Sequence, residues 1–310
     1  MNLAAIDFGS NSLRLLIARI ESSNSGIRVK PLIRDARINQ LGHSLHTDRI
    51  ISKEAVEKSH RILEDYLAYI AEYNCAGLYA VATSVFRDSV NGKTVKKAFE
   101  THLKTPIFTL SGQEEAELFF NGILTNRIHN PEIHYGCFDI GGGSTEYIIS
   151  HGTDIKNSVS LRLGCLRTKH VFFQHDPPTN REIIRFKQHV GETLKKQMPL
   201  SYTPDTFFGF GGTITTLARL ITGKSVDDVE NCPLSLKDIY TIFNSLSLIT
   251  DSEIGQTFSR YIDTGRETVL RAGILIVIAL MECLNSTEFT VTNQGILFGL
   301  LRQKYLLHTT

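Results

Sequence analysis

The sequence contains no tryptophan and only five cysteines among its 310 residues. The cysteines stand far apart and form no Cys-x-x-Cys pair, so neither a zinc site nor a disulfide framework is predicted; they are Cys75, Cys137, Cys165, Cys232 and Cys283. Free thiols in this number are typical of a cytoplasmic protein.

The sequence also lacks an excess of either charge and lacks a long hydrophobic run. Its 33 basic and 32 acidic residues leave a net charge of +1, which does not indicate binding to nucleic acid or to a membrane surface. The longest apolar run, Ala272 to Met281, is too short to cross a bilayer and predicts a buried helix. No basic segment precedes the first strand-like run, so no signal peptide is expected.

A short motif appears twice in the chain. Asp7-Phe-Gly-Ser-Asn-Ser-Leu is repeated 132 residues later as Asp139-Ile-Gly-Gly-Gly-Ser-Thr-Glu. Each copy lies between two apolar runs and predicts a strand, a tight turn and a second strand. Glycines let backbone N–H groups converge on an anion, and serine or threonine hydroxyls add donors. The alternative is a pair of purely structural β-turns.

Carboxylates accompany both copies of the motif. An aspartate at a strand end can bind Mg²⁺, to which a phosphate then binds. Glu146 follows Asp139 by seven residues on the returning strand, where a hairpin would bring both carboxylates to one ion. A solvated strand residue is the alternative for Glu146.

A third glycine turn follows the strand-like run at 206–208. Gly211, Gly212 and Thr213 open a helix there, and the N–H groups of a helix N-terminus attract anions. A structural turn explains the same pattern, but two similar turns elsewhere in the chain favour phosphate binding.

Two glutamates begin a helix near residue 112. Ser111 and Glu114 have the spacing of a capping box, which gives Glu114 a structural role. Glu115 has no such role and is a candidate general base, because nearby negative charge would raise its pKa.

Arg87, in the segment Ala82-Thr-Ser-Val-Phe-Arg-Asp, ends another strand-like run and is a candidate phosphate clamp through its planar guanidinium. A surface ion pair is the alternative. Weaker candidates for the same role are Arg14, Arg37, Arg162, Arg167 and Arg266.

The order of elements predicts the fold class. Three strand-like runs at 2–7, 13–20 and 27–34 precede helix–strand alternation, and the same order restarts at 134–139. It fits an α/β fold of duplicated ribonuclease-H-like domains with an interdomain cleft, the architecture of actin, sugar kinases and Hsp70. We expect a first domain over 1–112, a second over 113–297, and a last helix at about 298–310 that packs back on the first.

Together the quoted motifs, with Ser111-Gly-Gln-Glu-Glu-Ala and Gly211-Gly-Thr-Ile-Thr, resemble the exopolyphosphatase/guanosine pentaphosphate phosphohydrolase (Ppx/GppA) family from residue 3 to about 300. The resemblance implies a Mg²⁺-dependent hydrolase of terminal phosphoanhydrides, in the two-domain short form. Glu115 then matches the catalytic glutamate, and Asp139 and Glu146 match the metal carboxylates, with Asp7 beside them. The phosphate contacts implied are Ser10, Asn11, Ser12, Arg87, Gly142, Gly143, Ser144, Thr145 and Arg266.

The resemblance implies inorganic polyphosphate or pppGpp as substrate, a role in the stringent response, and Mg²⁺ with Mn²⁺ as the alternative ion. The stretch Thr292-Asn-Gln-Gly-Ile-Leu-Phe-Gly299 departs from the family because it lacks an arginine found there in other members. A kinase of the same superfamily and a non-catalytic polyphosphate or alarmone sensor are the alternatives. A homodimer is left open, since the sequence does not determine the oligomeric state.

Overall fold

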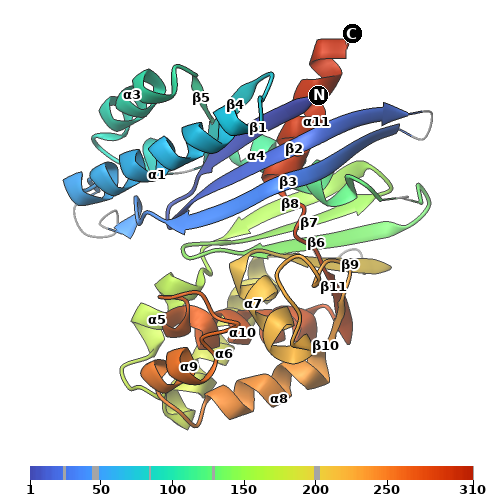
Figure 1. The fold of residues 1–310 in the computed structure, drawn as a ribbon. Coiled ribbons are helices and arrows are strands. Elements are labelled where there is room, and N and C mark those ends of the chain that lie inside the picture. The colour runs from blue at the N-terminus through green and yellow to red at the C-terminus, as the bar shows by residue number, and fades with distance from the viewer. Residues whose placement is uncertain (24–25, 44–48, 84, 128–129, 199–202, 310) are drawn as a thin grey trace. The chain divides into compact units, whose positions relative to one another are not determined.

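Figure 1 shows the computed structural model, which describes residues 1–23, 26–43, 49–83, 85–127, 130–198 and 203–309. Ser84, inside the predicted segment at 82–88, lies outside the described residues. The chain forms two compact units. Unit 1 comprises Met1–Ile128 and Gln294–Thr310, and unit 2 comprises His129–Asn293.

Unit 1 is built on a five-stranded sheet of order β3-β2-β1-β4-β5. Its strands are β1 (Asn2–Phe8), β2 (Ser12–Ser23), β3 (Gly26–Ile38), β4 (Leu78–Ala82) and β5 (Ile107–Thr109). The β1–β2–β3 meander is antiparallel, whereas β1, β4 and β5 run parallel. Parallel pairing requires a crossover between strands, and helices supply it.

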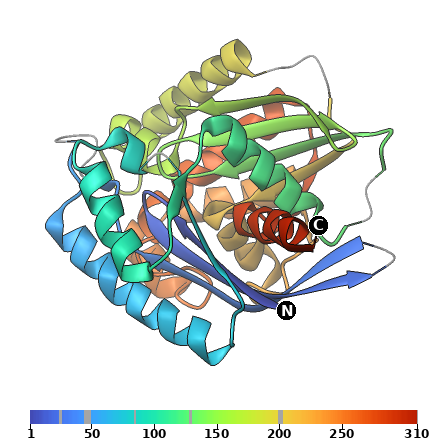
Figure 2. The same ribbon diagram turned by 90° about the horizontal axis from the view of Figure 1, so that it is seen from above.

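Helices cover both faces of this sheet. They are α1 (Lys53–Glu72), α2 (Val85–Asp88), α3 (Gly92–Leu103), α4 (Gly112–Leu124) and α11 (Ile296–Thr309). Ile6, Phe8 and Phe99 share a buried cluster with the inner faces of α1 and α3. Helix α11, at the C-terminal end of the chain, lies beside α4 (Figure 2) and also packs on β1 and β2.

Glycines bring α4 and α11 close together. A Cβ atom on Gly122 would lie 2.0 Å from the Gly295 carbonyl oxygen, and one on Gly299 would lie 2.0 Å from the Leu118 carbonyl oxygen. Only glycine allows such an approach of two backbones. This crossing explains the glycines at positions 122 and 299.

Unit 2 repeats the topology of unit 1. Its six-stranded sheet has the order β10-β11-β9-β6-β7-β8. The strands are β6 (His134–Ile140), β7 (Thr145–His151), β8 (Asp154–Leu161), β9 (Thr206–Phe210), β10 (Pro233–Ser235) and β11 (Glu288–Val291). Without the short β10, which the sequence did not predict, the order matches that of unit 1 strand for strand. The predicted α/β fold with duplicated ribonuclease-H-like units is therefore confirmed.

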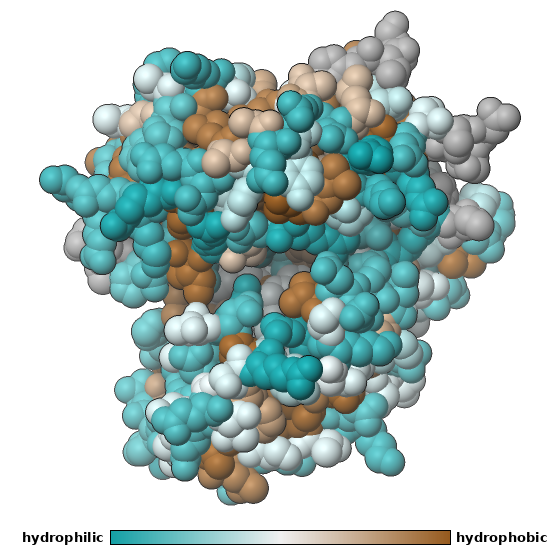
Figure 3. All heavy atoms as spheres, in the orientation of Figure 1, coloured by the Kyte–Doolittle hydropathy of each residue, from teal (hydrophilic) through white to brown (hydrophobic). Residues whose placement is uncertain are grey.

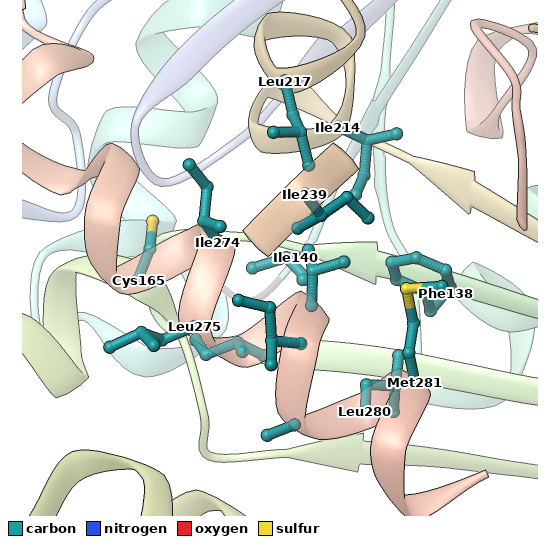
Figure 4. Close-up of a cluster of buried hydrophobic side chains, with 14 of the residues drawn as sticks. Phe138, Ile140, Cys165, Ile214, Leu217, Ile239, Ile274, Leu275, Leu280 and Met281 are labelled. Atoms are coloured by element: carbon teal, nitrogen blue, oxygen red, sulfur yellow. The ribbon is translucent and has the colours of Figure 1, made fainter. Parts of the chain in front are cut away.

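The core of unit 2 surrounds one buried helix. Helices α5 (Cys165–Phe172), α6 (Asn180–Gln197), α7 (Gly212–Thr222), α8 (Leu236–Leu246), α9 (Asp251–Thr257) and α10 (Glu267–Cys283) accompany the sheet. Figure 4 shows Ile274, Leu275 and Leu280 of α10 beside Phe138 and Ile140 of β6. Helix α10 is buried from Leu270 to Met281, as the apolar run predicted. Within the described ranges, no helix combines the length and the apolar character that a membrane span requires.

The division of the chain differs from the expected boundary at residue 112. Helix α4 belongs to unit 1, because it packs against α11, and the division falls after it. The capping box at Ser111 marks where a helix begins, but not which unit the helix packs on. In the view of Figure 3, hydrophilic side chains cover most of the visible surface of each unit, with hydrophobic ones scattered among them.

Candidate phosphate-binding site

The two copies of the sequence motif form turns of the same geometry. In the β1–β2 hairpin the Gly9 N–H donates to the Ser12 carbonyl at 3.1 Å, and in the β6–β7 hairpin the Gly141 N–H donates to the Ser144 carbonyl at 2.9 Å. Gly9 and Ser12 correspond to Gly141 and Ser144, with the offset of 132 positions that separates the two copies of the motif. The predicted strand–turn–strand units are confirmed by the pairing of both hairpins.

The carbonyl groups of Gly141, Gly142 and Gly143 all face the start of α5. The Gly141 carbonyl accepts the Cys165 N–H at 2.9 Å, and the Gly142 carbonyl accepts those of Leu166 and Arg167 at 3.0 and 3.1 Å. The Gly143 carbonyl accepts the Nε–H of Arg167 at 3.0 Å. In a trans peptide the C=O and N–H bonds point in opposite directions. The N–H groups of Gly142, Gly143 and Ser144 therefore point away from α5, in an arrangement that suits an anion.

Gly164 permits this close packing. A Cβ atom at Gly164 would lie 2.3 Å from the carbonyl group of Gly142. On Gly143, by contrast, an added Cβ atom would meet no atom within 4 Å among the described residues. One side of the turn is thus packed tightly against the start of α5, while the position of Gly143 has open space beside it.

The unit 1 turn is held in the same manner. The Ser10 carbonyl accepts the Gly42 N–H at 2.6 Å, and the Asn11 carbonyl accepts those of Asn39 and Gln40, both at 3.1 Å. Residues 39–42 follow the third strand of unit 1, just as α5 follows the third strand of unit 2. Ser10 and Asn11 are exposed, whereas Ser12 is buried.

Two carboxylates lie at the base of the unit 2 turn. Asp139 and Glu146 are direct cross-strand partners, and both are partly buried. Glu146 accepts a hydrogen bond from the Ser160 hydroxyl at 2.8 Å. Burial raises the pKa of Glu146, against the effect of hydrogen bonds from Ser144 and Ser160.

This pair fits a Mg²⁺ ion. Mg²⁺ is commonly held by one or two carboxylates together with water and phosphate oxygens. Over the described residues, no cluster of three or more His, Cys, Asp or Glu side chains is arranged to bind a metal. An ion held by Asp139 and Glu146 would therefore take its other ligands from substrate and water.

Asp7 occupies the matching place in unit 1. The residue is 4% exposed, and its Oδ1 atom has no hydrogen-bond partner within the described part of the chain. Arg14, its cross-strand partner, approaches Oδ2 at 3.9 Å. Burial raises the pKa of Asp7, and the positive charge of Arg14 opposes that rise. A buried carboxylate oxygen without a hydrogen-bond partner destabilises the folded state unless a cation or a water molecule contacts it.

The N-terminus of α7 approaches both a carboxylate and a guanidinium. Gly211 has φ +98°, and a Cβ atom there would lie 2.2 Å from Oδ1 of Asp139. A Cβ atom on Gly212 would lie 1.6 Å from Nη1 of Arg266, whose Nε is 3.1 Å from Asp263. Arg266 thus adds positive charge to a helix N-terminus, a combination that favours an anion. Thr213, the next residue, is buried.

Near the start of α4, the capping box is formed as predicted. The Ser111 hydroxyl accepts the Glu114 N–H at 3.2 Å, and Glu114 accepts the Ser111 N–H at 2.8 Å. These hydrogen bonds from Ser111 lower the pKa of Glu114. Glu115 takes no part in the cap and is partly buried. Arg87 donates from Nη1 to the Leu110 carbonyl at 2.9 Å, next to the helix start, and also pairs with Asp88 at 3.6 Å.

The predicted residues thus form groups within each unit. In unit 2, the carboxylate pair, the glycine turn, the start of α7 and Arg266 gather at the ends of β6 and β9. In unit 1, Asp7 and the Ser10–Ser12 turn lie at the end of β1. Thr145 is fully buried and its hydroxyl donates to the Leu163 carbonyl, so that hydroxyl serves the fold.

Sequence reasoning did not find the segments that hold the two turns, residues 39–42 and 164–167. The signal for them was their position, directly after the third strand of each repeat. That position shows that the segment can contact the turn. Which hydrogen bonds form depends on how the segment packs on the hairpin.

Two ribonuclease-H-like units with glycine–serine turns of matching geometry define a phosphate-handling protein of the actin-like type. The chain belongs to the Ppx/GppA phosphatase family, whose model matches residues 16–308. The predicted family is therefore confirmed, and with it the class of enzyme, a phosphatase.

Individual relatives agree with this assignment. The chain is 28% identical to Exopolyphosphatase 2 of Mycobacterium tuberculosis, over 96% of this chain and 97% of that protein. It is 30% identical to the bifunctional 3-dehydroquinate synthase/phosphatase of Fusobacterium nucleatum, and there it spans only 45% of the relative's length. The crystal structure of an Aquifex aeolicus Ppx/GppA family member is similar, with a TM-score of 0.85, 27% identity, and coverage of 100% of this chain and 99% of that one.

Proposed function

We propose that this protein is a Mg²⁺-dependent phosphohydrolase that releases the terminal phosphate of inorganic polyphosphate or pppGpp, acting in the cytoplasm. The observation that supports this most is the combination, in unit 2, of a glycine turn whose N–H groups point outward with two facing carboxylates at its base. Membership in a phosphatase family and an exopolyphosphatase among the relatives support polyphosphate as the substrate.

Substrate binding is assigned to the turns. The N–H groups of Gly142, Gly143 and Ser144 would bind oxygens of the terminal phosphate. The start of α7, from Gly211 to Thr213, and Arg266 would bind the phosphates behind it. Within unit 1, Ser10–Ser12 and Arg87 are the residues assigned to phosphate binding. Preorganised donors of this kind stabilise charge that develops in the transition state without reorganisation.

The chemistry is assigned to the carboxylates. Glu115 would accept the proton of the attacking water, because the capping box uses Glu114 and not Glu115. Asp139 and Glu146 would hold Mg²⁺ or Mn²⁺ directly, and Asp7 would act through a water bound to the ion. The ion, when bound, supplies charge neutralisation at the phosphoryl oxygens.

A phosphate-release assay tests the proposal. Long-chain polyphosphate, tripolyphosphate, pppGpp and ATP are compared with Mg²⁺, with Mn²⁺ and with EDTA. We expect phosphate release from polyphosphate or pppGpp without any acceptor molecule, and its loss in EDTA. Activity that needs a hydroxyl acceptor would indicate a kinase instead. Tight binding without any release would indicate a sensor.

A further inference from the structure

We propose that Arg167 is a positioning residue, whose Nε–H holds the Gly143 carbonyl so that the N–H groups of the Gly141–Ser144 turn stay directed at a phosphate. The inference rests on the proposed function, because that function assigns the turn to phosphate. It gives Arg167 a role different from that of a phosphate clamp, for which its charge alone made it a candidate.

The contacts of the turn lead to this role. Backbone N–H groups at the start of α5 hold the Gly141 and Gly142 carbonyls. The Gly143 carbonyl lies one peptide further along and receives a side-chain donor, Nε of Arg167, at 3.0 Å. The backbone N–H of Arg167 also binds Gly142, at 3.1 Å, so one residue contacts two successive peptides.

Gly143 has little other support. A Cβ atom there would meet nothing within 4 Å in the part of the chain that the structure describes. Glycine is also the residue with the most backbone freedom. Without the Nε–H donor, the peptide between Gly143 and Ser144 loses its hydrogen bond to α5, and the direction of the Ser144 N–H is held less firmly.

Comparison with unit 1 indicates that the carbonyl at this place in the turn requires a hydrogen-bond donor and not a positive charge. There the equivalent turn is held by the N–H groups of Asn39, Gln40 and Gly42, which carry no charge. In both units, donors from the segment after the third strand hydrogen-bond to the carbonyl groups of the turn. In unit 2, one of these donors is a side-chain atom, Nε of Arg167.

Three substitutions of Arg167 distinguish the effect of the Nε–H donor from the effect of the positive charge. Arg167→Gln places an amide nitrogen where Nε stands, and so keeps the donor but removes the charge. Arg167→Lys keeps the charge but has a methylene at that position. Arg167→Met has neither donor nor charge and similar bulk. We expect KM for tripolyphosphate to rise about tenfold in the Met and Lys variants and to be largely restored by Gln, as the loss and recovery of one hydrogen bond predict.

The opposite order, with Lys restoring and Gln failing, would show a charge contact and overturn the proposal. Equal loss in all three variants, or no loss in any, would overturn it too.

A second measurement does not depend on catalysis. Amide hydrogen exchange of Gly141 and Leu166, whose N–H groups bond to Ser144 and Gly142, reports whether the turn is closed. Exchange should accelerate in the Met and Lys variants and stay slow in Gln, with β9 as the internal reference for folding. Unchanged exchange in the Met variant would refute the positioning role. Absence of phosphate release by the wild-type protein, with this exchange pattern intact, would refute the proposed function alone.

Discussion

Asp139 and Glu146 stand directly opposite each other in the β6–β7 hairpin, so two carboxylates share the base of one glycine turn. Like charges in directly opposed positions destabilise a sheet. A bound cation would offset that cost, so the proposed Mg²⁺ site is expected to couple metal binding to stability.

We predict that Mg²⁺ raises the melting temperature of the wild-type protein and has little effect on Asp139→Asn or Glu146→Gln. A ligand that binds only the folded state stabilises it in proportion to its occupancy, and each substitution weakens the site. Thermal denaturation at several Mg²⁺ concentrations measures this directly. Without metal, each variant should melt no lower than the wild type, because the repulsion is gone. A Mg²⁺ response equal in wild type and variants would contradict the assignment.

Glu115→Gln should lower kcat by roughly 10²–10⁴, the range for loss of a general base, while substrate binding survives. Glu114→Gln is the matched control, because it changes the neighbouring residue in the same way. It should reduce thermal stability through the capping box and leave turnover close to that of the wild type. Steady-state phosphate release and thermal denaturation of both variants distinguish the two roles. Wild-type turnover in Glu115→Gln would exclude it as the base.

Arg87→Ala should raise KM for both polyphosphate and pppGpp, since the terminal phosphate is common to them. A near-neutral protein that binds a polyanion does so through local basic groups, and such contacts weaken with salt. KM for long polyphosphate should therefore rise with ionic strength more steeply than KM for pppGpp, and less steeply in the variant than in the wild type. KM values that do not respond to salt would argue against an electrostatic clamp.

Glu182 at the start of α6 should contribute a pH-dependent part of the stability. Burial works in the opposite direction, but hydrogen bonds from His175, Thr179 and Gln174 lower the pKa of Glu182 to about 2 from an ordinary value of 4.5. A depressed carboxyl pKa stabilises the fold above the ordinary value, and this contribution is lost as the pH falls through the folded-state value.

The urea midpoint of Glu182→Gln should therefore lie below that of the wild type above pH 4.5, and the difference should shrink as the pH falls toward 2. A difference that stays constant across this interval would show that the contribution does not come from the charge.

Gly299→Ala should destabilise the protein by about 1–3 kcal/mol, because the new methyl group would overlap the Leu118 carbonyl in the α4–α11 crossing. Gly191→Ala is the matched control. Gly191 lies inside α6, and a Cβ atom there meets nothing within 4 Å among the described residues. It should stabilise the protein by up to about 1 kcal/mol through helix propensity. Urea unfolding of both variants gives the comparison, and equal effects would show that the crossing tolerates a side chain.

The sequence by itself determined the features that depend on a few neighbouring residues. The glycine–serine turns, the capping box at Ser111 and the buried helix around Ala272 follow from backbone sterics, side-chain hydrogen bonding and periodicity, each of which acts within one or two turns of chain. The repeat at Asp7 and Asp139 then indicated the duplicated fold, because the same local order occurs twice.

Only the tertiary structure decided which distant segments meet. Helix α4 belongs with α11 because Gly122 and Gly299 allow their backbones to approach, which no local pattern reports. The Thr145 hydroxyl is used by Leu163, and Arg167 bonds to the backbone of the glycine turn, although both residues were candidates for phosphate contact. Residue type shows that a donor or a charge is present, whereas the direction in which it acts depends on the packing of segments far apart in the chain.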